Sequence, residues 1–93
     1  GVYRVDAFFA NGTYDVSDGN TCALRSLYLN GRRAGTLAFP HTSRSGNWEY
    51  FIYSTAVETV MTPGPCRVEV VYDSFSENMN RLVIKHLRFT RIS

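Results

Sequence analysis

The feature that most constrains this chain is a series of short segments in which apolar and polar residues alternate, separated by clusters of Gly, Pro, Asn and Asp. In residues 3–10, for example, Val5 and Ala7 alternate with Arg4 and Asp6. This period of two is typical of a β-strand that has one buried face. No segment shows sustained helical periodicity, so the sequence predicts an all-β fold.

Six strands are expected from this pattern. They are Tyr3–Ala10, Ala23–Leu29, Ala34–Phe39, Trp48–Val60, Arg67–Tyr72 and Leu82–Arg91. The dipeptide Asn30–Gly31 is a strong hairpin signal between the second and third strands, because both central residues of a type I′ turn need positive φ. Short links between successive strands favour an antiparallel β-sandwich, and 93 residues suit a single domain spanning 1–93.

The long polar loops are expected at one end of this sandwich. If consecutive strands run up and down, three loops share that end: Asn11–Thr21, His41–Asn47 and Asp73–Asn80. The links at the other end, Asn30–Gly31 and Thr62–Pro65, are tight turns. Long loops gathered on one rim of a rigid scaffold commonly carry function, so we expect a binding site there.

The two cysteines, Cys22 and Cys66, are not expected to form a disulfide with each other. The same strand order places Cys22 at the loop end and Cys66 at the opposite end. A six-residue strand spans about 20 Å, whereas a disulfide needs Cα atoms within about 7 Å of each other. Neither cysteine lies in a CxxC pair or near paired histidines, which argues against a metal site.

Charge and hydropathy argue against several kinds of partner. The net charge of +2 is too small for a nucleic-acid partner, which usually requires a concentrated basic stripe. No apolar run approaches the length that spans a membrane, so no membrane partner is expected. The chain opens directly on the strand-like segment 2–10 without a signal peptide, so an export signal is expected either to have been removed from upstream or never to have existed.

Five motifs follow one another along nearly the whole chain. They are Tyr3–Gly12 (YRVDAFFANG), Ser26–Gly31 with Gly35–Pro40 (SLYLNG and GTLAFP), Gly46–Phe51 (GNWEYF), Val68–Ser74 (VEVVYDS) and Ile84–Leu87 (IKHL). In this order they resemble the motifs of carbohydrate-binding modules of families six and thirty-five. The resemblance implies a jelly-roll β-sandwich of the galactose-binding type and a non-catalytic function in binding glycans.

Two departures from that family pattern shape further expectations. Members have additional strands before the one that matches residues 3–10, so this sandwich is expected to be incomplete at its N-terminus. A second chain, a cleaved N-terminal fragment or a second copy of this chain would then complete it, because exposed strand edges and an open apolar core are unfavourable. The alternative is that the domain is a shortened variant. Lys85 stands where the families place an acidic ligand of a structural calcium, so neither calcium nor another cofactor is expected.

Sugar recognition requires an aromatic ring that covers the apolar face of a pyranose, and polar groups that fix its hydroxyls. The rim loops are expected to supply both, with the rings of Trp48 and Tyr14 as stacking surfaces. The expected hydrogen-bonding side chains are Asn11, Asn78, Asn80 and Arg81. By the resemblance, Trp48 and Asn11 are the strongest candidates.

Each of these residues also has a structural alternative. Trp48 could cap one end of the core, since tryptophan is highly buried on average. Asn11 could hold a left-handed turn before Gly12, and it also begins the N-glycosylation sequon at residues 11–13. Tyr14 could pack on its own turn, and the other polar residues could be solvated.

No catalytic site is predicted, because the carboxylates are scattered and nothing in the sequence pairs two of them at a cleft. We therefore expect a secreted, non-catalytic glycan-binding module associated with an extracellular polysaccharide-active enzyme. The alternative is a structural or protein-interaction β-sandwich that forms part of a larger glycoside-active enzyme.

Overall fold

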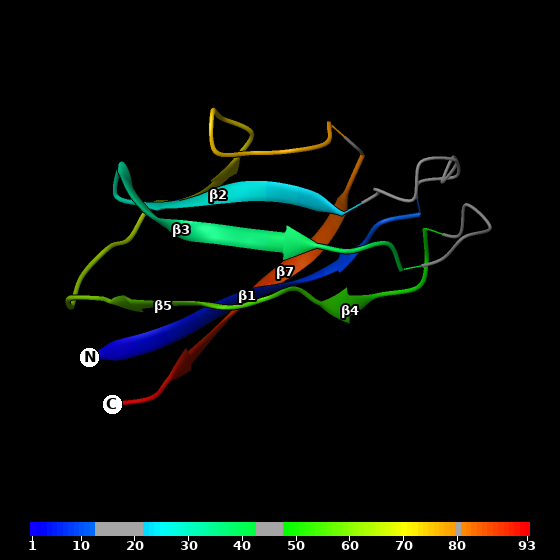
Figure 1. The fold of residues 1–93 in the computed structure, drawn as a ribbon. Helices are drawn as coiled ribbons and strands as arrows, with labels where there is room; N and C mark the ends of the chain where they lie inside the picture. Colours follow the sequence, from blue (N-terminus) through cyan, green and yellow to red (C-terminus); the bar gives the residue numbers. More distant parts are fainter. Residues whose placement is uncertain (13–21, 43–47, 80) are drawn as a thin grey trace.

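The computed structural model of the chain describes residues 1–12, 22–42, 48–79 and 81–93. Strands are the only regular secondary structure in these ranges, which confirms the all-β prediction. The seven strands are β1 (Val2–Ala10), β2 (Ala23–Leu29), β3 (Arg32–Phe39), β4 (Ile52–Tyr53), β5 (Val57–Val60), β6 (Val68–Val71) and β7 (Val83–Arg91) (Figure 1).

These strands form two antiparallel sheets that lie one above the other (Figure 1). In the first sheet β1 is central, with β7 along one edge and with β4 and β5 in succession along the other. In the second sheet β2 is central, between β3 and β6. The alternating strands therefore build two layers, as the period of two in the sequence predicted.

The hairpin between β2 and β3 is confirmed. Leu29 pairs with Arg32 across a two-residue turn. The turn residues Asn30 and Gly31 have φ values of 51° and 79°, the left-handed region that a type I′ turn requires. Asn30 also accepts a hydrogen bond on its side-chain oxygen from the backbone N–H of Arg67, at 2.8 Å, which ties this turn to the segment entering β6.

The expected long strand Trp48–Val60 is wrong, because the chain forms the two short strands β4 and β5 instead. At the break, the hydroxyl of Ser54 accepts a hydrogen bond from the N–H of Ala7, at 3.0 Å. The next residue, Thr55, leaves the first sheet and bonds to β3, where its hydroxyl accepts from the N–H of Ala38 at 2.8 Å. A side chain thus replaces a ladder bond. The backbone contacts the second sheet at Thr55 and then rejoins the first sheet in β5.

The core lies between the layers and joins them. Its buried residues come from both sheets: Val5, Ala7, Phe9, Ala23, Leu27, Leu37, Phe39 and Val57. Phe9 and Phe39 meet edge to face with ring centroids 4.9 Å apart. Gly35 of β3 lies so close to β5 that an added Cβ would be 2.9 Å from a methyl of Val57, so this side of the fold is tightly closed.

The cysteines lie as the strand order predicted. Cys22 directly precedes β2, and Cys66 precedes β6, whose first residue pairs with the last residue of β2. They are therefore at opposite ends of the second sheet, and neither is in a disulfide.

Candidate functional site

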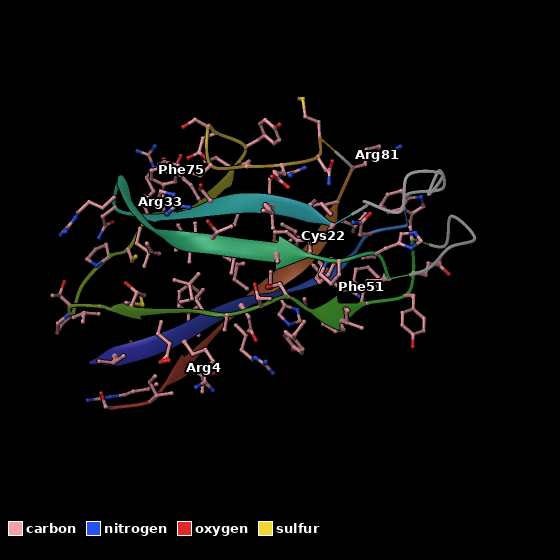
Figure 2. All side chains as sticks on the ribbon, in the orientation of Figure 1. Arg4, Cys22, Arg33, Phe51, Phe75 and Arg81 are labelled. Atoms are coloured by element: carbon pink, nitrogen blue, oxygen red, sulfur yellow. The ribbon has the colours of Figure 1, made fainter. Side chains whose placement is uncertain are left out.

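The described residues that border the first two loops, together with the end of the third, gather at one end of the fold, whereas the third loop begins at Asp73 beside Ser26 and Tyr28 of β2. Asn11 and Thr42 exchange two hydrogen bonds of 3.0 Å, one between backbone groups and one from the Asn11 N–H to the Thr42 hydroxyl. The side-chain amide of Asn78 donates to the carbonyl of Cys22 at 2.6 Å. Figure 2 shows Cys22 and Arg81 at this end. We call these bordering residues, 11–12, 22, 41–42, 48–50, 78–79 and 81, the loop rim.

Two of the sequence-predicted residues come together on the loop rim. The guanidinium carbon of Arg81 lies 5.8 Å from the ring centroid of Trp48, within cation–π range. Trp48 is half-buried, so its indole is not sealed in the core, and Arg81 is exposed. Tyr50 is 57% exposed and was missed by the sequence reasoning, although it lies two residues beyond Trp48. The predicted residues Tyr14 and Asn80 lie outside the described part of the chain.

Asn11 has a structural role in this fold. It is fully buried, and its side-chain amide donates to the carbonyl of Phe39 at 3.0 Å. This bond joins the end of β1 in the first sheet to the end of β3 in the second. With its amide buried and bound to Phe39, Asn11 supports the fold at this end, the structural alternative that the sequence offered.

Asn78 also serves the fold. Its φ of 57° is left-handed, a conformation that asparagine tolerates better than most residues. With its amide bound to the carbonyl of Cys22, it fastens the end of the third loop to the beginning of β2. Asn78 is half-buried, and its position supports the rim more directly than it offers a free amide to a ligand.

An aromatic row on the outer face of the first sheet was not predicted. Cross-strand pairing aligns Phe8 of β1 with Tyr53 of β4 on one side and with His86 of β7 on the other. The Phe8 ring centroid lies 4.8 Å from Tyr53, 5.1 Å from His86 and 5.5 Å from Phe51. The sequence did contain a signal for this row. Phe8 is the one aromatic residue on the polar face of its strand, the face that also carries Arg4 and Asp6.

Three aromatic residues of the segment 48–53 each have a cationic side chain over their ring. Besides Arg81 over Trp48, the ammonium of Lys85 lies 4.8 Å from the Phe51 centroid and the guanidinium of Arg88 lies 3.6 Å from the Tyr53 centroid. Lys85 stands where the resembled families place an acidic calcium ligand. Here its ammonium packs over the ring of Phe51. These three ring–cation pairs form a row from the loop rim to the outer face of the first sheet.

Arg88 is also held by a carboxylate. Its Nε and Nη2 atoms donate to the two oxygens of Asp6 at 3.0 and 2.6 Å, a bidentate pair. Asp6 is buried, whereas Arg88 remains exposed. These hydrogen bonds raise the pKa of Arg88. They also hold its guanidinium over the ring of Tyr53.

Asp73 organises the start of the third loop. Its carboxylate accepts hydrogen bonds from the hydroxyl of Tyr28 at 2.6 Å, from the hydroxyl of Ser26 at 2.8 Å and from the backbone N–H of Phe75 at 3.0 Å. The bond from Tyr28 is the largest cause that lowers the pKa of Asp73 from 3.8 to about 2, although partial desolvation opposes it. The same bond raises the pKa of Tyr28.

The depressed pKa of Asp73 predicts a loss of stability in acid. Since the folded-state pKa is about 2 and the unfolded value is 3.8, the ionised carboxylate stabilises the fold above pH 3.8. That contribution falls as the pH drops from 3.8 toward 2. Urea unfolding at pH 5, 4, 3 and 2.5 should show a larger decrease for the wild type than for Tyr28→Phe or Asp73→Asn. Equal decreases in all three proteins would contradict this assignment.

The part of the chain that the structure describes contains neither a cluster of metal-ligating side chains nor a helix that could span a membrane. No three His, Cys, Asp or Glu side chains there come close enough together to hold a metal ion. No helix in those same ranges is long and apolar enough to cross a membrane.

Comparison of the chain with protein-family models, with curated proteins and with solved structures finds no match in any of the three. The loop rim and the aromatic row are therefore interpreted from their own chemistry.

Proposed function

We propose that this chain is a non-catalytic glycan-binding module that binds sugar on the loop rim. The observation that carries the proposal is the placement of Trp48, half-exposed, beside Arg81 at the end of the fold where the borders of three loops meet. An indole face covers the C–H face of a pyranose, and a guanidinium donates hydrogen bonds to hydroxyls. Tyr50, which is exposed beside Trp48 in the chain, extends the aromatic surface.

Several features support this proposal without belonging to the rim itself. The two antiparallel layers are compatible with the jelly-roll sandwich of the galactose-binding type that the sequence motifs resemble. The side-chain amides of Asn11 and Asn78 are bound to the carbonyls of Phe39 and Cys22, so they fix the geometry of the rim. Hydrogen bonds to the sugar are assigned to Arg81 and, from the sequence, to Asn80.

The proposal also states which kind of enzyme this module would serve. A binding module of this kind serves a secreted enzyme that acts on polysaccharides, by holding it against its substrate. No catalytic residue is assigned to this chain, and no calcium or other cofactor is invoked for binding. The sugar contacts consist of ring stacking and hydrogen bonds alone.

Trp48→Ala is expected to weaken glycan binding at least about 30-fold, which corresponds to the 2 kcal/mol that defines a central binding residue. Trp48 is the only tryptophan in the chain, so titration of the wild type with oligosaccharides should also change its intrinsic fluorescence. A glycan array would identify the ligand, and calorimetry would compare the variants. Thermal unfolding should show that Trp48→Ala remains folded, because the indole is only half-buried.

Phe75→Ala is the matched control. Phe75 is 60% exposed and lies against Arg33 on the outer face of the second sheet, away from Arg81 (Figure 2). Its removal should leave glycan affinity unchanged. The proposal fails if Trp48→Ala binds as tightly as the wild type, or if ligand binding leaves the tryptophan fluorescence unchanged.

A further inference from the structure

The two sides of the layered fold differ sharply. On one side the sheets are tied together, by Thr55 bonded to Ala38 and by the amide of Asn11 bonded to Phe39. On the other side stand β7 of the first sheet and β6 of the second. Each of these strands pairs with only one neighbour among the strands of the described residues, so each presents a free backbone edge there. The edge of β7 is the longer, at nine residues or about 30 Å.

The inner face of β7 carries apolar side chains that are only partly covered. Cross-strand pairing sets Phe89 opposite Val5 and Ile84 opposite Phe9. Directly opposite residues share a face of the sheet, so both side chains point toward the core layer. Val5 and Phe9 are fully buried, whereas Phe89 is 39% exposed and Ile84 is 37% exposed. If another strand paired with the free edge of β7, its side chains would cover Phe89 and Ile84.

The facing edge of the second sheet has the same character. Val68 and Val70 of β6 pair with the buried residues Leu29 and Leu27, yet both valines are only half-buried. At the end opposite the loop rim, a hollow of about 460 Å³ is lined by Tyr3, Met61, Phe89, Arg91 and their neighbours. Phe89 therefore belongs both to the exposed inner face of β7 and to the lining of this hollow.

The charge of β7 selects its occupant. The strand carries Lys85, His86, Arg88 and Arg91 and contains no acidic residue. Within the described ranges, Lys85 and Arg91 are in no salt bridge, and Arg88 is paired with Asp6. A second copy of β7 would bring these like charges together, which disfavours a dimer through this edge. A strand with acidic side chains would be attracted instead.

We propose that the free edge of β7 accepts an extended segment of another polypeptide in which apolar and acidic residues alternate. Its backbone pairs with β7 as an added strand, the addition mode by which exposed sheet edges bind peptides. Its apolar side chains cover Phe89 and Ile84 on the inner face, and its acidic side chains lie on the outer face near Lys85 and Arg88. This inference does not depend on glycan binding, because the loop rim takes no part in it.

The test uses synthetic nine-residue peptides in which Val alternates with Glu, with terminal charges blocked. We expect binding by calorimetry, with increased hydrogen-exchange protection of the β7 amides. A peptide with Lys in place of Glu should bind at least about tenfold more weakly, since like charges repel at the edge. A Val–Glu peptide interrupted by proline should also lose affinity, because proline cannot donate to the ladder.

Variants of the protein make the test specific. Phe89→Ser should weaken binding of the Val–Glu peptide, whereas Val60→Ser, a change at a residue 73% exposed on β5, should not. The variant Lys85→Glu, which changes a cation on the outer face, should reverse the preference and select the Val–Lys peptide. Equal binding of both peptides, no binding of either, or a dimer of the free protein held through β7 in sedimentation would each overturn the proposal.

Discussion

Phe9→Ala is expected to destabilise the fold by about 3–5 kcal/mol, the range found when a buried phenylalanine is truncated. Phe9 is fully buried at the centre of the core and meets Phe39 of the opposite sheet edge to face, with centroids 4.9 Å apart. Its loss removes transferred apolar area and leaves a cavity at the contact that joins the two layers. Small domains have a free energy of unfolding of only about 5–15 kcal/mol, so this substitution would remove a large part of it.

Urea unfolding followed by far-ultraviolet circular dichroism measures this change. Val60→Ala is the control, because Val60 is 73% exposed and surface truncations usually change stability by less than about 0.5 kcal/mol. Phe9→Leu should fall between the control and the alanine variant, since it keeps part of the buried volume. A loss below 1 kcal/mol for Phe9→Ala would mean that the two sheets do not share the core described above.

Sequence reasoning was most successful where a strand's role is decided by its own residues. The bounds of β2 are those predicted, and β1 and β7 each differ from the prediction by one residue at one end. The period of two in these segments reflects burial of one face, and that burial is visible locally as alternating residue types. The hairpin succeeded for a similar reason, because Asn30 and Gly31 satisfy the turn's need for positive φ by themselves.

The failure at residues 48–60 has a different cause. The segment is rich in Tyr, Phe, Thr and Val, which favour strands, and nothing within it marks the break. The break exists because Ser54 and Thr55 find partners on different sheets, Ala7 in the first and Ala38 in the second. Those partners lie far away in the chain, so the side-chain bonds that interrupt the ladder could not be read from local pattern.

The up-and-down strand order placed Cys22, Trp48 and Arg81 at one end, and they lie there, because that argument needs only the direction of each strand. The same argument placed Asp73 at that end, whereas Asp73 lies beside Ser26 and Tyr28 of β2. The aromatic row depends on register across three strands, which sets Phe8 between Tyr53 and His86. Register between non-adjacent segments is a property of the assembled sheet, and no single strand in the sequence specifies it.

Substitutions of Asn11 distinguish most clearly between a structural role and a role in binding a ligand. Asn11→Ala is expected to destabilise the fold by about 1–3 kcal/mol, because it removes the donor and leaves the buried carbonyl of Phe39 without that hydrogen bond. Asn11→Asp should be worse than alanine at neutral pH, since a carboxylate cannot donate to a carbonyl and its charge would be buried.

The paired measurement is stability against glycan affinity, in Asn11→Ala and Trp48→Ala side by side. The asparagine variant should lose stability and, at a temperature where it is folded, should bind glycan as the wild type does. The tryptophan variant should show the reverse. Asparagine and aspartate have nearly the same shape, so a stability loss in Asn11→Asp isolates the donated hydrogen bond and the buried charge from any loss of packing. If Asn11→Ala instead keeps its stability and loses glycan affinity, the amide faces the ligand and the link between β1 and β3 is not what closes this end of the fold.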